Sequence, residues 1–158
     1  MSKNGQNIKL PPEFSGPAQF VLYTRYGDPR EPGWEHKWID NWHIRKEFPW
    51  FPEESISIHK HFRPILQKAL RELEIRGLHE EIKTCDGCTK LRNAPSDTSV
   101  LSLHAWGAAL DLNAKDNPHG SVGKWSEKFI EIMTAAGVYC GQNWEGRQDP
   151  MHFAMLDG

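Results

Sequence analysis

The chain has 158 residues, with 19 Lys and Arg against 21 Asp and Glu, and its formal net charge is −2. This length suits one domain with its own hydrophobic core, and the charge gives no reason to expect a nucleic-acid partner. No apolar run is long enough to span a bilayer, so we expect no membrane insertion.

The cysteines and the N-terminus indicate where the protein is made. Three cysteines are too few for a disulfide framework. The first residues, MSKNGQNIKLPPEF, lack the apolar core of a secretory signal. We therefore expect synthesis and folding in the cytoplasm.

The N-terminal third shows little periodicity. Residues 1–55 are rich in Pro, Gly and Trp, and we expect loops and short elements that wrap on a core of residues 56–158, within one domain of residues 1–158. Trp34, Trp38 and Trp42 are spaced four residues apart, which permits a short helix.

Two apolar stripes predict helices. The first helix is HFRPILQKALRELEIRG, residues 61–77, with Pro64 in its first turn and Gly77 at its end. The second lies in KWSEKFIEIMTAAG, residues 124–137, with its apolar side chains, Trp125 among them, on one face. Helices and short strands mix without regular β-α-β alternation, which indicates an α+β fold. The expected strands are 56–58, 110–113, 138–140 and 152–156.

The stretch SLHAWGAALDLN places His104 seven residues before Asp111. In a helix the two side chains would lie two turns apart, and in a strand the odd separation would point them to opposite faces. A turn at Gly107 lets them converge, and alternation after it places Asp111 on the strand face opposite two leucines. A buried His–Asp hydrogen bond that holds the turn would also account for this pair alone.

A second pair, Asp149 and His152, lies in QDPMHFAML. Pro150 disfavours helical angles at the residue before it, so we expect an extended approach to a strand that begins near His152. A catalytic zinc site needs three protein ligands and an open position for water, and His104, Asp111 and His152 form such a set. Asp149 is then available as a base that takes a proton and passes it to the leaving amine.

These residues resemble a known family. SLHAWGAALD matches S-x-H-x-x-G-x-A-x-D, the signature of the zinc D-alanyl-D-alanine peptidases, which include VanY-like carboxypeptidases, vancomycin-resistance dipeptidases and phage L-alanyl-D-glutamate endolysins. DPMHF resembles the second family motif, and CDGCTKLR resembles the segment that carries the active-site arginine, here Arg92. The resemblance covers roughly residues 55–156. It departs from the family at Ala154, where a Glu usually stands.

The resemblance implies a small antiparallel sheet flanked by helices, as in the hedgehog and D-Ala-D-Ala peptidase group. It implies one zinc ion per chain. It also implies a general base, and an arginine that polarises the scissile carbonyl. The zinc ligands would be His104, Asp111 and His152, the base Asp149 and the arginine Arg92.

Three further features are less specific. Ser102 is a candidate for substrate contact or for orienting the loop, and a purely structural hydroxyl is equally compatible. Trp144 is a candidate wall of the cleft, although core packing is the simpler interpretation. Cys85 and Cys88 form a CxxC pair, for which we expect free thiols in a loop rather than a metal or redox site.

The implied function is a monomeric zinc peptidase that acts on peptidoglycan stem peptides. Our first expectation is a phage endolysin that cleaves the L-alanyl–D-glutamate bond and reaches the wall of an infected cell after release. The second is a D-alanyl-D-alanine carboxypeptidase. A non-catalytic zinc fold that binds the cell wall is a different class of function, which would not need Asp149 or Arg92.

Overall fold

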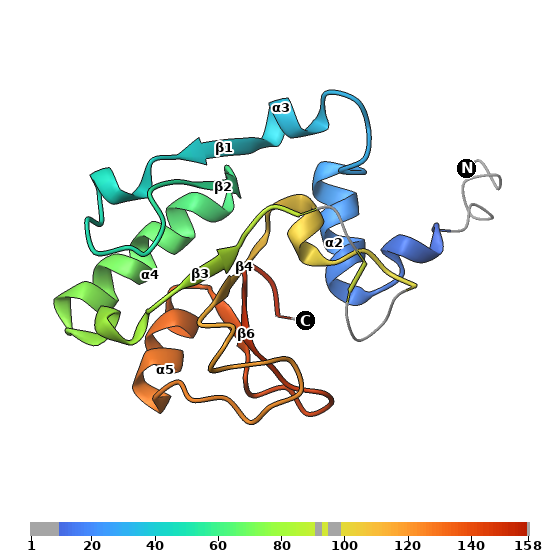
Figure 1. Ribbon diagram of the computed structural model, residues 1–158. Helices are drawn as coiled ribbons and strands as arrows, with labels where there is room; N and C mark the ends of the chain where they lie inside the picture. The colour runs from blue at the N-terminus through green and yellow to red at the C-terminus, as the bar shows by residue number, and fades with distance from the viewer. Residues whose placement is uncertain (1–9, 91–92, 95–98, 158) are drawn as a thin grey trace.

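The computed structural model describes residues 10–90, 93–94 and 99–157. Its α+β architecture confirms the predicted fold class: a two-stranded antiparallel sheet, β1–β2, and a four-stranded antiparallel sheet of order β3-β4-β6-β5 are surrounded by helices (Figure 1). In the described part of the chain, no helix is both long and apolar enough to cross a membrane. The elements, with η for 3-10 helices, are η1 (Pro12–Phe14), α2 (Pro17–Tyr26), α3 (Trp34–Trp38), β1 (Ile39–Trp42), η2 (Ile44–Lys46), β2 (Ile56–His59), α4 (Phe62–Ile75), η3 (Leu78–Glu81), β3 (Cys85–Gly87), η4 (Leu103–Trp106), β4 (Ala109–Leu112), α5 (Glu127–Ala135), β5 (Tyr139–Gly141) and β6 (Asp149–Ala154).

The N-terminal region contains more regular structure than its sequence indicates. The sequence shows no clear apolar stripe over helix α2, because the buried residue Gln19 interrupts it. Gln19 Nε2 donates a hydrogen bond to the main-chain oxygen of Leu101 at 2.8 Å. The expected tryptophan helix is only partly right, since α3 ends at Trp38 and Trp42 lies in β1. Strand β1 pairs antiparallel with β2.

Both predicted helices are present with shorter bounds. Helix α5 begins after Ser126, whose Oγ accepts a hydrogen bond from Phe129 N at 3.2 Å and so caps the first turn. Trp125 therefore precedes the helix, contrary to the expectation. Its ring stacks on Phe129 with 4.4 Å between centroids, so it still packs against the same apolar face.

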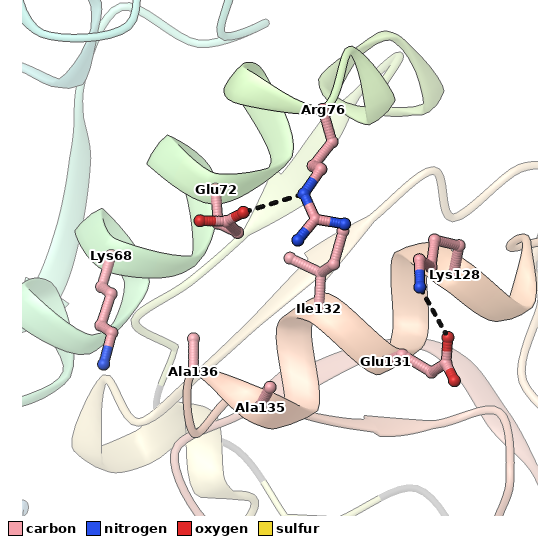
Figure 2. A pocket seen from close by; sticks show the side chains of 8 residues that line it. All are labelled: Lys68, Glu72, Arg76, Lys128, Glu131, Ile132, Ala135 and Ala136. Carbon is pink, nitrogen blue, oxygen red and sulfur yellow. Dashed lines mark hydrogen bonds and ion pairs between the residues drawn. The ribbon is translucent and has the colours of Figure 1, made fainter.

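Helices α4 and α5 contact each other, and a groove of about 460 Å³ runs between them (Figure 2). Two ion pairs flank it: Glu72 of α4 with Arg76, which caps that helix, at 3.0 Å, and Lys128–Glu131 of α5 at 3.7 Å. Ile132 contributes to the apolar part of its lining. None of the groove residues belongs to the predicted zinc site.

The central strands β4 and β6 separate an apolar face from a polar one. Leu110 pairs with Phe153, and Phe153 packs against Phe129 of α5 with 5.9 Å between ring centroids. The adjacent pair, Asp111 and His152, points to the opposite face because side chains alternate along a strand. The sheet thus buries its leucines on the face where Phe153 packs against α5, and it presents a carboxylate and an imidazole on its other side.

Strand β6 begins at Asp149, three residues earlier than expected. Its pairing with β5 shifts register, since Cys140 pairs with Phe153 whereas the next residue, Gly141, pairs with Asp149. Pro150 lies inside this irregular stretch. Proline has no N–H to donate to a neighbouring strand, so a bulge is where a strand tolerates it.

Candidate metal centre

A capped 3-10 turn positions His104. Ser102 precedes η4, and its Oγ accepts a hydrogen bond from His104 N at 3.2 Å. Gly107 ends the turn with φ +67°, a left-handed conformation that favours glycine. A Cβ at Gly107 would also lie 2.6 Å from Ile39 Cδ1 and 2.8 Å from His59 N. Backbone conformation and packing together therefore select glycine at the turn that the sequence places here.

The turn brings His104 beside the cross-strand pair Asp111 and His152. One ligand atom from each of the three side chains lies within 4.8 Å of the other two. His104 Nε2 is 3.1 Å from Asp111 Oδ1, and the rings of His104 and His152 are 5.6 Å apart. Within the described ranges, this is the single group of three or more such side chains close enough to share an ion.

The hydrogen bonding of His104 tests whether the group suits a metal. Its Nδ1 lies 2.6 Å from the main-chain oxygen of Cys88, which can only accept, so Nδ1 carries the proton. In the neutral ring Nε2 then presents a lone pair toward the carboxylate of Asp111. Two acceptors at this distance require a cation or a proton between them. A carbonyl that fixes the tautomer of a histidine is a typical partner of a metal ligand.

Burial and donor chemistry agree with a zinc site. His104 is 2% and His152 6% exposed, while the Asp111 side chain is 13% exposed. Two imidazole nitrogens and one carboxylate oxygen are common zinc ligands, and three of them leave a coordination position open. The donor set therefore fits zinc.

A cleft of about 490 Å³ opens beside this group. Residues of the 85–90 segment form one part of its lining, and two of the three clustered side chains form another. A peptide in this cleft would contact the cluster directly. The lining residues are Asp86, Gly87, Thr89, Lys90, His104 and Asp111.

Of the remaining predicted site residues, the structure describes Asp149 and Trp144. Asp149 is buried, 7% exposed, at the start of β6, and is not part of the three-residue group. The ring of Trp144 lies 5.4 Å from that of His152, and Trp144 Nε1 donates to Asp157 Oδ1 at 3.3 Å. Arg92 lies outside the described residues.

The cysteines are free thiols, and of the CxxC pair only Cys88 lies in a loop as expected. Cys85 begins β3, and all three cysteines are buried. Burial raises the pKa of Cys85 to about 12 and that of Cys88 well above its usual value. Thiols with raised pKa values are poor nucleophiles and poor zinc ligands at neutral pH.

Two contributions to the site have no signal in the sequence. Cys88 acts through its main-chain oxygen, which any residue would provide. Lys90 joins the cleft because its main-chain nitrogen donates to His104 O at 2.8 Å, a pairing between segments far apart in the chain. Only the folded backbone brings these groups to the cluster.

Comparison with known proteins adds one match. Residues 96–155 match the sequence model of a family described as D-alanyl-D-alanine carboxypeptidase. Neither curated proteins nor solved structures gave a match to the chain. The matched segment covers less than half of the chain, but it includes η4, β4, α5, β5 and β6. The chain is thus similar to this carboxypeptidase family over the segment that carries His104, Asp111 and His152.

Proposed function

We propose that the protein is a zinc-dependent peptidase that cleaves peptidoglycan stem peptides. The observation that carries this proposal is the group of His104, Asp111 and His152 beside an open cleft. The family match over residues 96–155 supports the same conclusion.

His104 Nε2, Asp111 and His152 would hold one zinc ion. When bound, zinc supplies Lewis acidity, which polarises a peptide carbonyl and lowers the pKa of a water molecule at the site. The contact between His104 Nδ1 and the Cys88 oxygen keeps the ring in the tautomer that ligation needs. Cross-strand pairing fixes Asp111 opposite His152.

Asp149 is the proposed general base. It would accept a proton from the attacking water and deliver it to the departing amine nitrogen. Its place outside the three-residue group supports this role, because a fourth protein ligand would close the open position. The bulge at Pro150 supports it too, since strict alternation would point residues 149 and 152 to opposite faces.

Arg92 is the proposed group that stabilises the oxyanion of the tetrahedral intermediate. A guanidinium suits this task because it stays charged and offers a planar fork of donors. Removing one oxyanion donor typically costs on the order of a hundredfold or more in kcat, so Arg92→Ala should retain zinc and lose turnover by that factor. Normal kcat in Arg92→Ala would remove Arg92 from the mechanism.

Trp144 and Ser102 are proposed to act near the substrate in different ways. The contact of Trp144 with the His152 ring supports a role as a wall of the site. The Ser102 hydroxyl accepts from His104 N, which supports orientation of the metal-binding turn.

Two bonds are candidates for cleavage. The motifs resemble those of the phage endolysins, which favours the L-alanyl–D-glutamate bond, and we propose this endopeptidase activity first. The description of the matched family favours the D-alanyl-D-alanine carboxypeptidase activity. Mass spectrometry of purified sacculi after digestion by the zinc-loaded protein separates the two activities. The endopeptidase cleaves the stem after its first residue, L-alanine, whereas the carboxypeptidase removes a single terminal D-alanine. Unchanged muropeptides would reject both.

A further inference from the structure

Lys90 lines the cleft beside the three-residue group of His104, Asp111 and His152, and two acidic residues line it as well. One of these acidic residues, Asp111, belongs to the three-residue group itself. Asp86 Oδ2 accepts hydrogen bonds from the Thr84 hydroxyl and from Ala114 N, each at 2.9 Å. In the part of the chain that the structure describes, Lys90 forms no ion pair. Its charge is therefore available to a ligand.

The backbone around Lys90 is fixed relative to the metal-binding histidine. Lys90 N donates to the main-chain oxygen of His104 at 2.8 Å, and the Cys88 oxygen accepts from His104 Nδ1 at 2.6 Å. Between them, the Thr89 hydroxyl donates to the main-chain oxygen of Ser57. The stem of Lys90 thus starts from a defined point beside the site, while its ammonium can adjust to a bound group.

Both candidate substrates carry an anion at the same place. In the L-alanyl–D-glutamate bond the glutamate continues through its γ-carboxyl, so its α-carboxylate stays free on the carbon attached to the scissile nitrogen. In D-alanyl-D-alanine the terminal carboxylate occupies the equivalent position. A cation beside the site would meet this carboxylate on either peptide, and charge-assisted contacts are stronger than neutral ones.

We propose that Lys90 binds the free α-carboxylate of the residue that follows the scissile bond and so selects peptides that carry it. This proposal rests on the proposed peptidase function, because it assumes that the scissile bond lies at the metal group. Lys90 would thus discriminate against peptides in which that carboxylate is amidated.

Binding to the metal-free protein tests the proposal, since no metal can then attract the carboxylate. The probes are N-acetyl-L-alanyl-γ-D-glutamyl-L-lysine and the same peptide with its α-carboxylate amidated, titrated by NMR. Wild-type protein should bind the carboxylate form roughly tenfold more tightly. Lys90→Met should abolish this preference and Lys90→Arg should keep most of it. Lys68→Met, in the groove between α4 and α5, is the matched control and should keep all of it.

A preference that persists in Lys90→Met, or that is lacking in wild type, would overturn the proposal. Hydrolysis of the two peptides by the zinc-loaded protein separates this outcome from failure of the peptidase function. Hydrolysis of both at equal kcat/KM would reject the carboxylate site and keep the peptidase. Selective binding that Lys90→Met abolishes, without hydrolysis of either peptide, would reject the peptidase and keep the carboxylate site.

Discussion

Asp111 and His152 face each other directly across the antiparallel pair β4–β6. Leu110 precedes Asp111 and Phe153 follows His152, and both of these apolar side chains face the core. The same alternation that buries the core therefore aligns a carboxylate with an imidazole on the opposite face. His104 completes the group from outside the sheet, through the turn that ends at Gly107.

The first prediction concerns the metal. Purified protein should bind about one zinc per chain, since one possible ligand atom from each of His104, Asp111 and His152 lies within 4.8 Å of the other two. His104→Ala and His152→Ala should each lose it, as measured by elemental analysis after dialysis. His43→Ala, at an exposed position, is the control and should retain it. Stoichiometric zinc in both site variants would refute the ligand set.

The second prediction compares two glycines with the same backbone conformation. Gly107 has φ +67° and Gly77 has φ +73°, but only at Gly107 would a Cβ meet other atoms, at 2.6 and 2.8 Å. Gly77→Ala should therefore cost only the strain of the left-handed backbone, about 1 kcal/mol of unfolding free energy. Gly107→Ala should cost more, about 2 kcal/mol or above, and should weaken zinc binding because the turn that carries His104 must shift.

Urea denaturation and zinc titration measure both effects. Gly77→Ala serves as the control because it lies at the end of α4, away from the metal group. Equal losses of stability in the two variants, with native zinc affinity, would show that the packing around Gly107 tolerates a methyl group.

The convergence of His104, Asp111 and His152 could be predicted from the identity and spacing of these side chains. The spacing of His104 and Asp111 requires a turn between them if they are to converge, and Gly107 provides it. The long helix α4 followed from a regular apolar stripe. In each case a local rule and the tertiary structure agree.

The remaining features depend on contacts that no local pattern encodes. Strand β3 has three residues and exists because it pairs with β4. Helix α2 buries Gln19 because a distant main-chain oxygen accepts its hydrogen bond. Strand β6 starts before Pro150 because a bulge accommodates the proline. Tertiary pairing, rather than propensity, determines all three.

The third prediction concerns His59, which is fully buried among Tyr26, Trp34, Trp38 and His61. Burial lowers the pKa of His59 from its usual 6.5 to about 4. Below about pH 6.5 the unfolded chain takes up a proton there and the folded protein does not, so stability falls as the pH drops from 6.5 to 4. At pH 5 the loss from this group should be on the order of 2 kcal/mol relative to pH 7.5.

Urea unfolding of the metal-free protein at both pH values measures this loss without a contribution from zinc. His59→Phe should be less stable than wild type at pH 7.5, because His61 N loses the Nδ1 acceptor that it contacts at 3.0 Å. It should nevertheless lose about 2 kcal/mol less on acidification. The exposed His36→Phe should follow the wild-type profile. An unchanged pH dependence in His59→Phe would mean that this ring protonates as readily in the folded protein as in the unfolded chain.

The last prediction separates catalysis from metal binding, and it concerns Asp149. This carboxylate is 7% exposed at the start of β6 and outside the three-residue group. Asp149→Asn keeps the size and shape of the side chain but cannot carry a proton between water and the leaving amine. The variant should bind zinc with near-native affinity and lose peptidase activity by roughly a hundredfold to ten-thousandfold. Asp149→Glu should retain part of the rate, because it offers the same chemistry from a displaced position.

The assay is release of peptides from purified sacculi, with zinc measured on the same sample. Asp116→Asn is the control, since it makes the same change at an exposed position. Full activity in Asp149→Asn would reject the assignment of the base. An inactive Asp149→Asn that has also lost its zinc would instead make Asp149 a ligand or a structural residue, and the proton would then have to pass through another group near the cleft.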